Sequence, residues 1–187
     1  MRVLRYANSD VPEEMRIQVL KAQAAAWPTT SVEPGPDPAL SPLSLLLVEG
    51  GTVLSSLTVL SKEIIHAGES YFAGGLSAVV TAPNARGHGY GHHLVVAARE
   101  FMEADRFDIG LFTCDRPLQG FYETAGWSAL VGCVLVGGTS EAPFPSDSPG
   151  FDKVTMGGFM SEHARNNRNS FRSTRIRLYP GDIDRLW

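Results

Sequence analysis

A short β-branched segment, a glycine-rich loop and an amphipathic stretch follow one another over residues 76–105. Residues 76–81 read LSAVVT, a composition that suits a strand, and Pro83 ends it. After a loop that reads RGHGYG at 86–91, apolar residues recur at spacings of three, four and seven over 94–102, which predicts a helix with one buried face. The order strand, glycine loop and helix is the main constraint on the fold and on the ligand.

The loop at 86–91 predicts an anion-binding site. Glycines let a backbone approach its ligand closely, and the free N–H groups of a first helical turn point toward negative charge. Arg86 adds a fixed positive charge whose forked donors suit phosphate. The spacing is not Gly-x-Gly-x-x-Gly and no Gly-Lys-Ser/Thr ends the loop, so a dinucleotide fold is poorly supported and a P-loop is excluded. The expected ligand is a phosphate or pyrophosphate.

Two motifs carry a resemblance to a known family. The loop fits the pattern Arg/Gln-x-x-Gly-x-Gly/Ala and resembles the acetyl-CoA pyrophosphate loop of the GNAT N-acetyltransferases. Residues 118–127 read LQGFYETAGW and resemble that family's hydrophobic-Tyr-x-x-x-Gly-hydrophobic segment, which here follows a predicted strand at 109–113. The resemblance implies an α/β fold with a central mixed, mostly antiparallel twisted sheet, flanking helices and splayed central strands.

The resemblance also implies that the chain binds acetyl-CoA and transfers its acetyl group directly to an amine, through a tetrahedral intermediate. Backbone groups of Val79 and Thr81 are expected to bind pantetheine and to polarise the thioester. The residues expected to hold the cofactor are Val79, Val80, Thr81, Arg86, Gly87, His88, Gly89, Tyr90, Gly91 and His92.

Tyr122 is the candidate catalytic acid, because the matching tyrosine donates a proton to the departing sulfur in many GNAT enzymes. A phenol can do this work. The alternative is a core role, since Leu118, Phe121, Tyr122 and Ala125 lie on one helical face.

Within the superfamily the chain most resembles the aminoglycoside 2'-N-acetyltransferases, in which acids and the C-terminal carboxylate line the acceptor site. The implied base is Asp182 or the terminal carboxylate of Trp187. A cluster of carboxylates is also what a polyamine sugar requires, since each ammonium needs a counter-charge. The residues expected to bind the substrate are Glu33, Asp37, Ser77, Thr113, Asp152 and Asp184.

One position departs from the family pattern. Ser77 occupies the place where the family enzymes carry a glutamate that can act as base through water. Either the base has moved to a carboxylate such as Asp182, or water alone suffices for an amine of low pKa. The resemblance implies an aminoglycoside-type antibiotic as the lead substrate, and the altered position at Ser77 allows an unusual member such as kasugamycin. Two alternatives stay open: acetylation of another amine (a polyamine, an amino sugar or a peptide N-terminus), and a non-catalytic acetyl-CoA sensor.

Two other chemistries are not expected. His88 and His92 are four residues apart, but no carboxylate completes a metal site. Cys114 falls beside the predicted cleft and suits a small buried residue better than an acyl carrier.

Length, charge and composition limit the number of domains, the partners and the cellular compartment that we expect. The 187 residues suit one domain with a proper core, so 1–187 is expected to be a single domain. A formal charge of −4 argues against nucleic acid as a partner. No apolar run is long enough to span a bilayer and no signal-peptide region is visible. Two cysteines do not make a disulfide framework, so a cytoplasmic setting is expected. The family resemblance allows a homodimer.

The remaining segments are assigned from their patterns. We expect Asp10 to cap a first helix, and 161–173 to be a solvated polar insertion, with a polyanion site as the alternative. The proline-rich loop at 28–42 is either a flexible surface connection or, as the family resemblance implies, one wall of the acceptor site. The other expected elements are strands at 1–6, 43–49, 53–61, 63–66, 70–72, 127–136, 153–160 and 174–179, a helix continuing to residue 26, a loop at 137–151 and a tail ending at 187.

Overall fold

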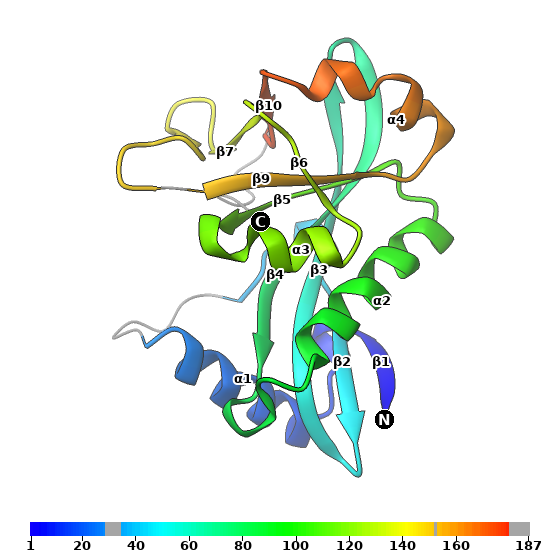
Figure 1. The fold of residues 1–187 in the computed structure, drawn as a ribbon, viewed down its shortest axis with the longest axis vertical. Helices are drawn as coiled ribbons and strands as arrows, with labels where there is room; N and C mark the ends of the chain where they lie inside the picture. The colour runs from blue at the N-terminus through cyan, green and yellow to red at the C-terminus, as the bar shows by residue number, and fades with distance from the viewer. Residues whose placement is uncertain (29–34, 152, 180–187) are drawn as a thin grey trace.

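The structure is a computed structural model and describes residues 1–28, 35–151 and 153–179. Seven strands form a large mixed sheet whose central pair is parallel and whose other neighbouring pairs are antiparallel (Figure 1). In spatial order these strands are β1 (Arg2–Ala7), β2 (Leu43–Glu49), β3 (Thr52–His66), β4 (Glu69–Thr81), β5 (Ile109–Asp115), β9 (Lys153–Phe159) and β6 (Ser128–Ala129). This arrangement confirms the predicted fold class.

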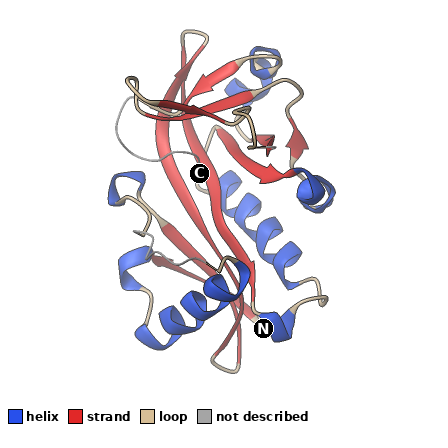
Figure 2. Ribbon diagram, turned by 90° about the vertical axis from the view of Figure 1, so that its left-hand side faces the viewer, coloured by secondary structure: helices blue, strands red, loops and turns tan. Residues whose placement is uncertain are grey.

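Two helices cover opposite faces of the large sheet. Alternate residues of β2 point to opposite faces. Leu46 and Val48 pack against Met15 and Val19 of α1 (Glu13–Ala26), whereas Leu45 and Leu47 join the core that includes the buried face of α2 (Tyr90–Ala104). Figure 2 shows these two helices on either side of the long strands.

The start of α1 corrects one prediction. Asp10 does not cap this helix, because it belongs to a separate 3-10 turn, Asn8–Asp10, and Pro12 is the residue that precedes the first turn. Pro12 has no N–H to satisfy, which suits the entry to a helix.

The predicted break between strands 53–61 and 63–66 is wrong, whereas the break expected between 63–66 and 70–72 is present as a turn. β3 is continuous to His66, and Ala67 and Gly68 form the tight turn into β4 with φ values of 51° and 84°. A turn in which both central residues have positive φ matches the twist of a hairpin, so one long hairpin forms where the sequence suggested shorter strands.

The predicted strand 127–136 is also wrong. The chain leaves the large sheet after β6, because Cys133 N–H bonds to the Leu130 carbonyl and Gly132 has a φ of 69°. It then enters a second sheet whose strand order is β10-β7-β8, so the loop expected at 137–151 contains a strand. The bounds of these strands are β7 (Val134–Gly138), β8 (Pro143–Pro145) and β10 (Arg175–Arg177).

The segment 161–173 is more than a solvated insertion. It forms α4 (Glu162–Asn166) and a 3-10 helix, η5 (Arg168–Phe171). Phe171 is fully buried, with its ring centroid 4.6 Å from that of His66 and 5.2 Å from that of Tyr71. The buried Phe171 side chain therefore holds segment 161–173 against the β3–β4 hairpin.

The parallel strands β4 and β5 touch only at one end. They pair at Ala73 with Ile109 and at Gly74 with Gly110, and then separate (Figure 1). Both paired glycines accept close side chains: a Cβ on Gly74 would lie 2.4 Å from Met102 Cε, and one on Gly110 would lie 2.3 Å from Trp127 Cζ3. Because Gly74 and Gly110 lack side chains, Met102 and Trp127 can pack closely against the sheet where β4 and β5 diverge.

Gly110→Ala is expected to lower the free energy of unfolding by about 1–3 kcal/mol, because the added methyl group overpacks the contact with the Trp127 ring. Chemical denaturation measures this loss. The control is Gly120→Ala on α3 (Gln119–Thr124), where a Cβ meets nothing within 4 Å. Equal effects of the two substitutions would show that the packing at Gly110 is loose.

Candidate active site

The splayed strands β4 and β5 form the candidate active site. Beyond Gly74, β4 hydrogen-bonds to β3 on one side and has no strand partner on its β5 side among the described residues. A bulge interrupts the β3 pairing, since Ser56 pairs with Val80 and Thr58 with Ser77, and Ala78 within it has a φ of 50°. Bulges redirect backbone groups and often lie next to active sites.

The predicted cofactor-binding residues of β4 differ in what they can offer a ligand. The Val80 carbonyl accepts a hydrogen bond of 2.8 Å from Ser55 Oγ, so it is directed into the sheet. Val79 lies in the bulge without a strand partner, and the Thr81 carbonyl receives only a 3.3 Å bond from Arg86 Nε. The backbone groups of Val79 and Thr81 are therefore the better placed for a ligand.

The glycine-rich loop connects the end of β4 to the first turn of α2. Gly87 and Gly89 have φ values of 80° and 76°, and a Cβ on either would meet nothing within 4 Å. Gly91 serves a different purpose, because its Cβ would lie 2.9 Å from Thr81 Oγ1. Two glycines supply left-handed backbone beside open space, and the third permits the helix to approach the strand. The free N–H groups of such a helical turn are chemically suited to an anion.

Three polar side chains surround this turn. Arg86 is exposed, and His88 Nδ1 lies 2.9 Å from the Arg86 carbonyl while its ring stacks on Tyr90 at 5.6 Å. The His92 ring lies 6.3 Å from that of Phe121 on α3. In residues 1–28, 35–151 and 153–179, no group of three His, Cys, Asp or Glu is arranged to hold a metal ion.

Tyr122 lies on α3, which follows β5 after the short 3-10 helix Arg116–Leu118. Its ring makes edge contacts with Phe112 of β5 at 4.9 Å and with Phe121 at 5.0 Å. A Cβ added to Gly91 would lie 3.6 Å from Cζ of Phe121. The helix that carries Tyr122 is therefore packed against the glycine loop. Burial, followed by the neighbouring Cys114 and Asp115, raises the pKa of Tyr122 far above its ordinary value of 10.0. The phenol therefore stays protonated at neutral pH and can donate a proton or hydrogen bond.

The two cysteines are buried thiols. Burial raises the pKa of Cys114 to about 11 and that of Cys133 to about 12. A thiolate is the nucleophilic form, so Cys114 is poorly suited to carry an acyl group at neutral pH.

These thiols predict alkaline destabilisation. From the ordinary value of 9.0 upward, unfolded thiols lose protons that Cys114 and Cys133 retain when folded. The unfolded chain then binds fewer protons, so the free energy of unfolding falls as pH rises from about 9 toward 11 or 12. Denaturation curves at pH 8 to 10 measure it, and the double variant Cys114→Ala/Cys133→Ala should have a flatter slope. An unchanged slope would assign the loss to other groups.

A row of hydroxyl side chains crosses the α1 face of the large sheet and was not recognised in the sequence. Tyr6, Ser44, Thr58 and Ser77 are paired in register across β1, β2, β3 and β4. Tyr6 packs with the α1 cluster, which places the whole row on that face. Thr58 is nine-tenths buried and its hydroxyl bonds to no described residue, whereas Ser44 Oγ donates to Asn8 Oδ1 at 2.8 Å. The row ends at Ser77, next to the bulge.

Other predicted acceptor residues are dispersed. Thr113 is half-buried on β5, opposite Thr155 of β9. Asp37 accepts a 2.8 Å bond from Ala39 N–H and so caps the 3-10 helix Pro38–Leu40. The remaining predicted residues lie outside the described part of the chain: Glu33, Asp152, Asp182, Asp184 and Trp187.

Comparison with known proteins gives a family and a fold. The model of the acetyltransferase (GNAT) domain matches residues 13–130, well over half of the chain. A search of curated protein sequences finds no match. In the part of the chain that the structure describes, no helix is long and apolar enough to cross a membrane.

Solved structures share the fold at low sequence identity. An acyl-CoA N-acyltransferase from Pseudomonas aeruginosa superposes with a TM-score of 0.59 at 18% identity, covering 83% of this chain and 97% of that one. An aminoglycoside 6'-N-acetyltransferase complexed with coenzyme A gives a TM-score of 0.59 at 11% identity, covering 86% and 98%. An aminoglycoside acetyltransferase from an uncultured soil metagenomic sample gives 0.53 at 16% identity, covering 66% and 86%.

Proposed function

This chain belongs to the GNAT acetyltransferase family, and we propose that it transfers an acetyl group from acetyl-CoA to a primary amine of a small cationic molecule. The observation that carries the proposal is the divergence of β4 and β5 beside the glycine-rich N-terminus of α2. Direct transfer needs two reactants held in one geometry and no enzyme nucleophile. The buried, protonated Cys114 agrees with that mechanism.

The residues present fit the proposed cofactor. The N–H groups at the start of α2 and the exposed Arg86 would hold the pyrophosphate, and the backbone of Val79 and Thr81 would hold the pantetheine arm. Acetyl-CoA supplies the activated thioester. Tyr122 is proposed to protonate the departing sulfur, because its raised pKa keeps its proton available.

The lead acceptor is an aminoglycoside-type antibiotic acetylated on a 2'-amino group, including a kasugamycin-like member. Its support is the sequence resemblance, and two structural neighbours act on aminoglycosides. The proposed base is Asp182 or the terminal carboxylate of Trp187, with Glu33, Asp37, Asp152 and Asp184 as counter-charges for the acceptor and the Thr113 carbonyl as a hydrogen-bond acceptor for its amine. The hydroxyl row ending at Ser77 adds neutral hydrogen-bonding groups on the α1 face.

Ser77→Ala is expected to raise the KM of the acceptor several-fold and to leave the KM of acetyl-CoA unchanged. The substitution removes one hydrogen bond of about 1 kcal/mol on the acceptor side of the bulge. Steady-state kinetics with each reactant varied in turn separates the two constants. Thr58→Val, the neighbour in register, should act in the same direction. A change confined to the KM of acetyl-CoA would place Ser77 on the cofactor side.

Substrate class is tested by the mass and the acetylation position of the product. Kasugamycin, 2-deoxystreptamine aminoglycosides, polyamines, amino sugars and peptides with free N-termini are each incubated with acetyl-CoA. A product heavier by one acetyl group on a 2'-amine supports the aminoglycoside assignment. Turnover only with peptides, polyamines or simple amino sugars would keep the acetyltransferase and overturn that assignment.

A non-catalytic acetyl-CoA sensor is the second candidate. The observation that favours it is Ser77 at the position where the family pattern has a glutamate. Tight acetyl-CoA binding without turnover of any amine would select it.

A further inference from the structure

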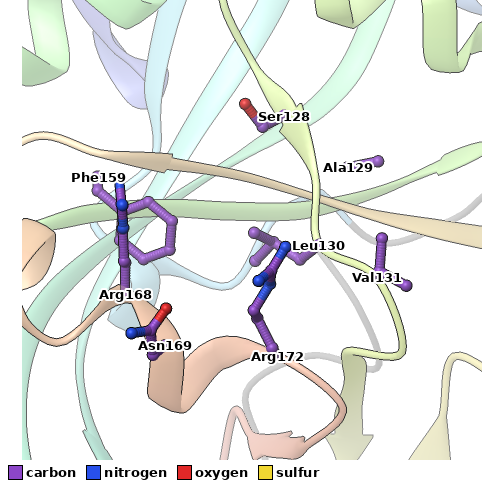
Figure 3. A pocket seen from close by; sticks show the side chains of 8 residues that line it. All are labelled: Ser128, Ala129, Leu130, Val131, Phe159, Arg168, Asn169 and Arg172. Carbon is purple, nitrogen blue, oxygen red and sulfur yellow. The ribbon is translucent and has the colours of Figure 1, made fainter.

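A cavity lies at the outer edge of the large sheet, away from the diverging part of β4 and β5. Its volume is about 360 Å³, within the size range of small-ligand sites. The walls come from β6 with the residues after it, from the end of β9, and from the segment that contains η5 (Figure 3). None of the residues proposed for acetyl transfer lines it.

One wall of this cavity is cationic. Arg168, Asn169 and Arg172 line it, and Figure 3 shows both arginine side chains extending from the same segment toward the strands. Neither guanidinium forms an ion pair or side-chain hydrogen bond with a described residue, whereas Arg175 pairs with Asp147 at 2.6 Å. The lining includes no Asp or Glu among the described residues. Two free guanidiniums facing one cavity attract an anion locally, although the chain as a whole has a formal charge of −4.

Most of the remaining lining is apolar. It consists of Ala129, Leu130, Val131 and Phe159. Val131 is 72% exposed and Ile65 is the one large aliphatic residue among the described exposed ones with a higher value, 76%. The ligand that matches both parts of the lining has an anionic end and an apolar body.

The cationic wall is held in place from behind. Phe171 ends the 3-10 helix η5, directly before Arg172, and is fully buried against His66 and Tyr71. His66 Nε2 lies 2.8 Å from the Ser170 carbonyl, which fixes the backbone of the same segment. The backbone that carries the arginines is therefore ordered before a ligand arrives, which reduces the entropy cost of binding.

We propose that this cavity binds a small organic carboxylate with a compact apolar body. A planar guanidinium pairs with a carboxylate through two parallel hydrogen bonds, and the Asn169 amide offers a further donor. A bare phosphate would leave the apolar part of the lining unused, and the lining contains no turn of backbone N–H groups of the kind that holds phosphate.

The test is calorimetric or NMR titration of the full chain with benzoate, and with benzamide as the neutral molecule of the same shape. Benzoate is expected to saturate at millimolar concentration and to shift resonances of Val131 and Phe159, while benzamide binds at least about tenfold more weakly. No saturable benzoate binding would overturn the proposal, as would equal binding of benzamide. Inorganic phosphate that binds as tightly as benzoate would also overturn it.

Variants connect the binding to this cavity. Arg168→Gln and Arg172→Gln should each weaken benzoate binding about tenfold, and Val131→Glu should abolish it by placing a carboxylate beside the two guanidiniums. The matched control is Arg177→Gln on β10, which removes the same charge from an exposed position outside the cavity. Equal weakening by Arg177→Gln would show that benzoate responds only to net charge and would overturn the site.

Discussion

Tyr122→Phe is expected to lower kcat about a hundredfold or more while the KM of acetyl-CoA changes little. The substitution removes only the phenolic hydroxyl, and general acid catalysis of this kind contributes about 10² to 10⁴ in rate. The ring contacts with Phe112 and Phe121 remain, so the fold should be kept. Burial raises the pKa of Tyr122 above 10.0. At pH values up to 10.0 the phenol therefore keeps its proton, and loss of that proton should not lower the wild-type rate in this range. Initial rates of thiol release between about pH 7 and pH 10 measure both effects.

Tyr71→Phe is the matched control for that experiment. Tyr71 is also buried and its hydroxyl has no hydrogen-bond partner among the described residues, but it lies under α4, away from the glycine loop. Its removal should leave kcat unchanged. If Tyr122→Phe also kept the wild-type kcat, Tyr122 would be a core residue, as its helical face allows, and the acid would have to be sought elsewhere.

Arg86→Gln is expected to raise the KM of acetyl-CoA by about ten- to a hundredfold with a smaller effect on kcat. A charge-assisted hydrogen bond contributes about 1.5–3 kcal/mol, and Arg86 is placed to form one at the start of α2. Its Nε already bonds to the Thr81 carbonyl at 3.3 Å, which orients the side chain between strand and helix. Calorimetric titration with coenzyme A measures the loss without requiring turnover.

Two comparisons sharpen that result. Arg2→Gln, on the exposed β1 edge, removes the same charge and should leave coenzyme A binding unchanged. High salt should weaken binding to the wild-type protein more than to Arg86→Gln, since the screened charge is absent from the variant. Equal affinities of wild type and Arg86→Gln would place the pyrophosphate elsewhere.

The strand, the glycine-rich loop and the helix over 76–105 could be predicted because they depend on local patterns, whereas the fold class was implied by the family resemblance. The positive φ of Gly87 and Gly89 and the buried face of α2 follow directly from residue type and spacing. The family resemblance suggested a catalytic role for Tyr122. The structure adds that Phe121 packs near Gly91, which brings the helix of Tyr122 close to the glycine-rich loop.

Features that depend on register and long-range packing could not be predicted. The hydroxyl row can be recognised only once Ser44, Thr58 and Ser77 are known to pair across neighbouring strands. The alternation of leucines with these residues indicates strands, but it does not fix which residues pair. The Leu-Val-Gly-Cys run at 130–133 is apolar enough to continue a strand, yet the turn at Gly132 redirects it. The arginines of 161–173 are exposed, as their charge predicts, but the burial of Phe171 behind them is a tertiary contact that the sequence does not reveal.

The most direct test of the proposed acetyl transfer is the release of free thiol from acetyl-CoA by the 187-residue chain across the amine panel. We expect saturable release with at least one small cationic amine, a product heavier by one acetyl group, and loss of release in Tyr122→Phe. Coenzyme A binding without thiol release from any amine would contradict acetyl transfer and leave a binding protein.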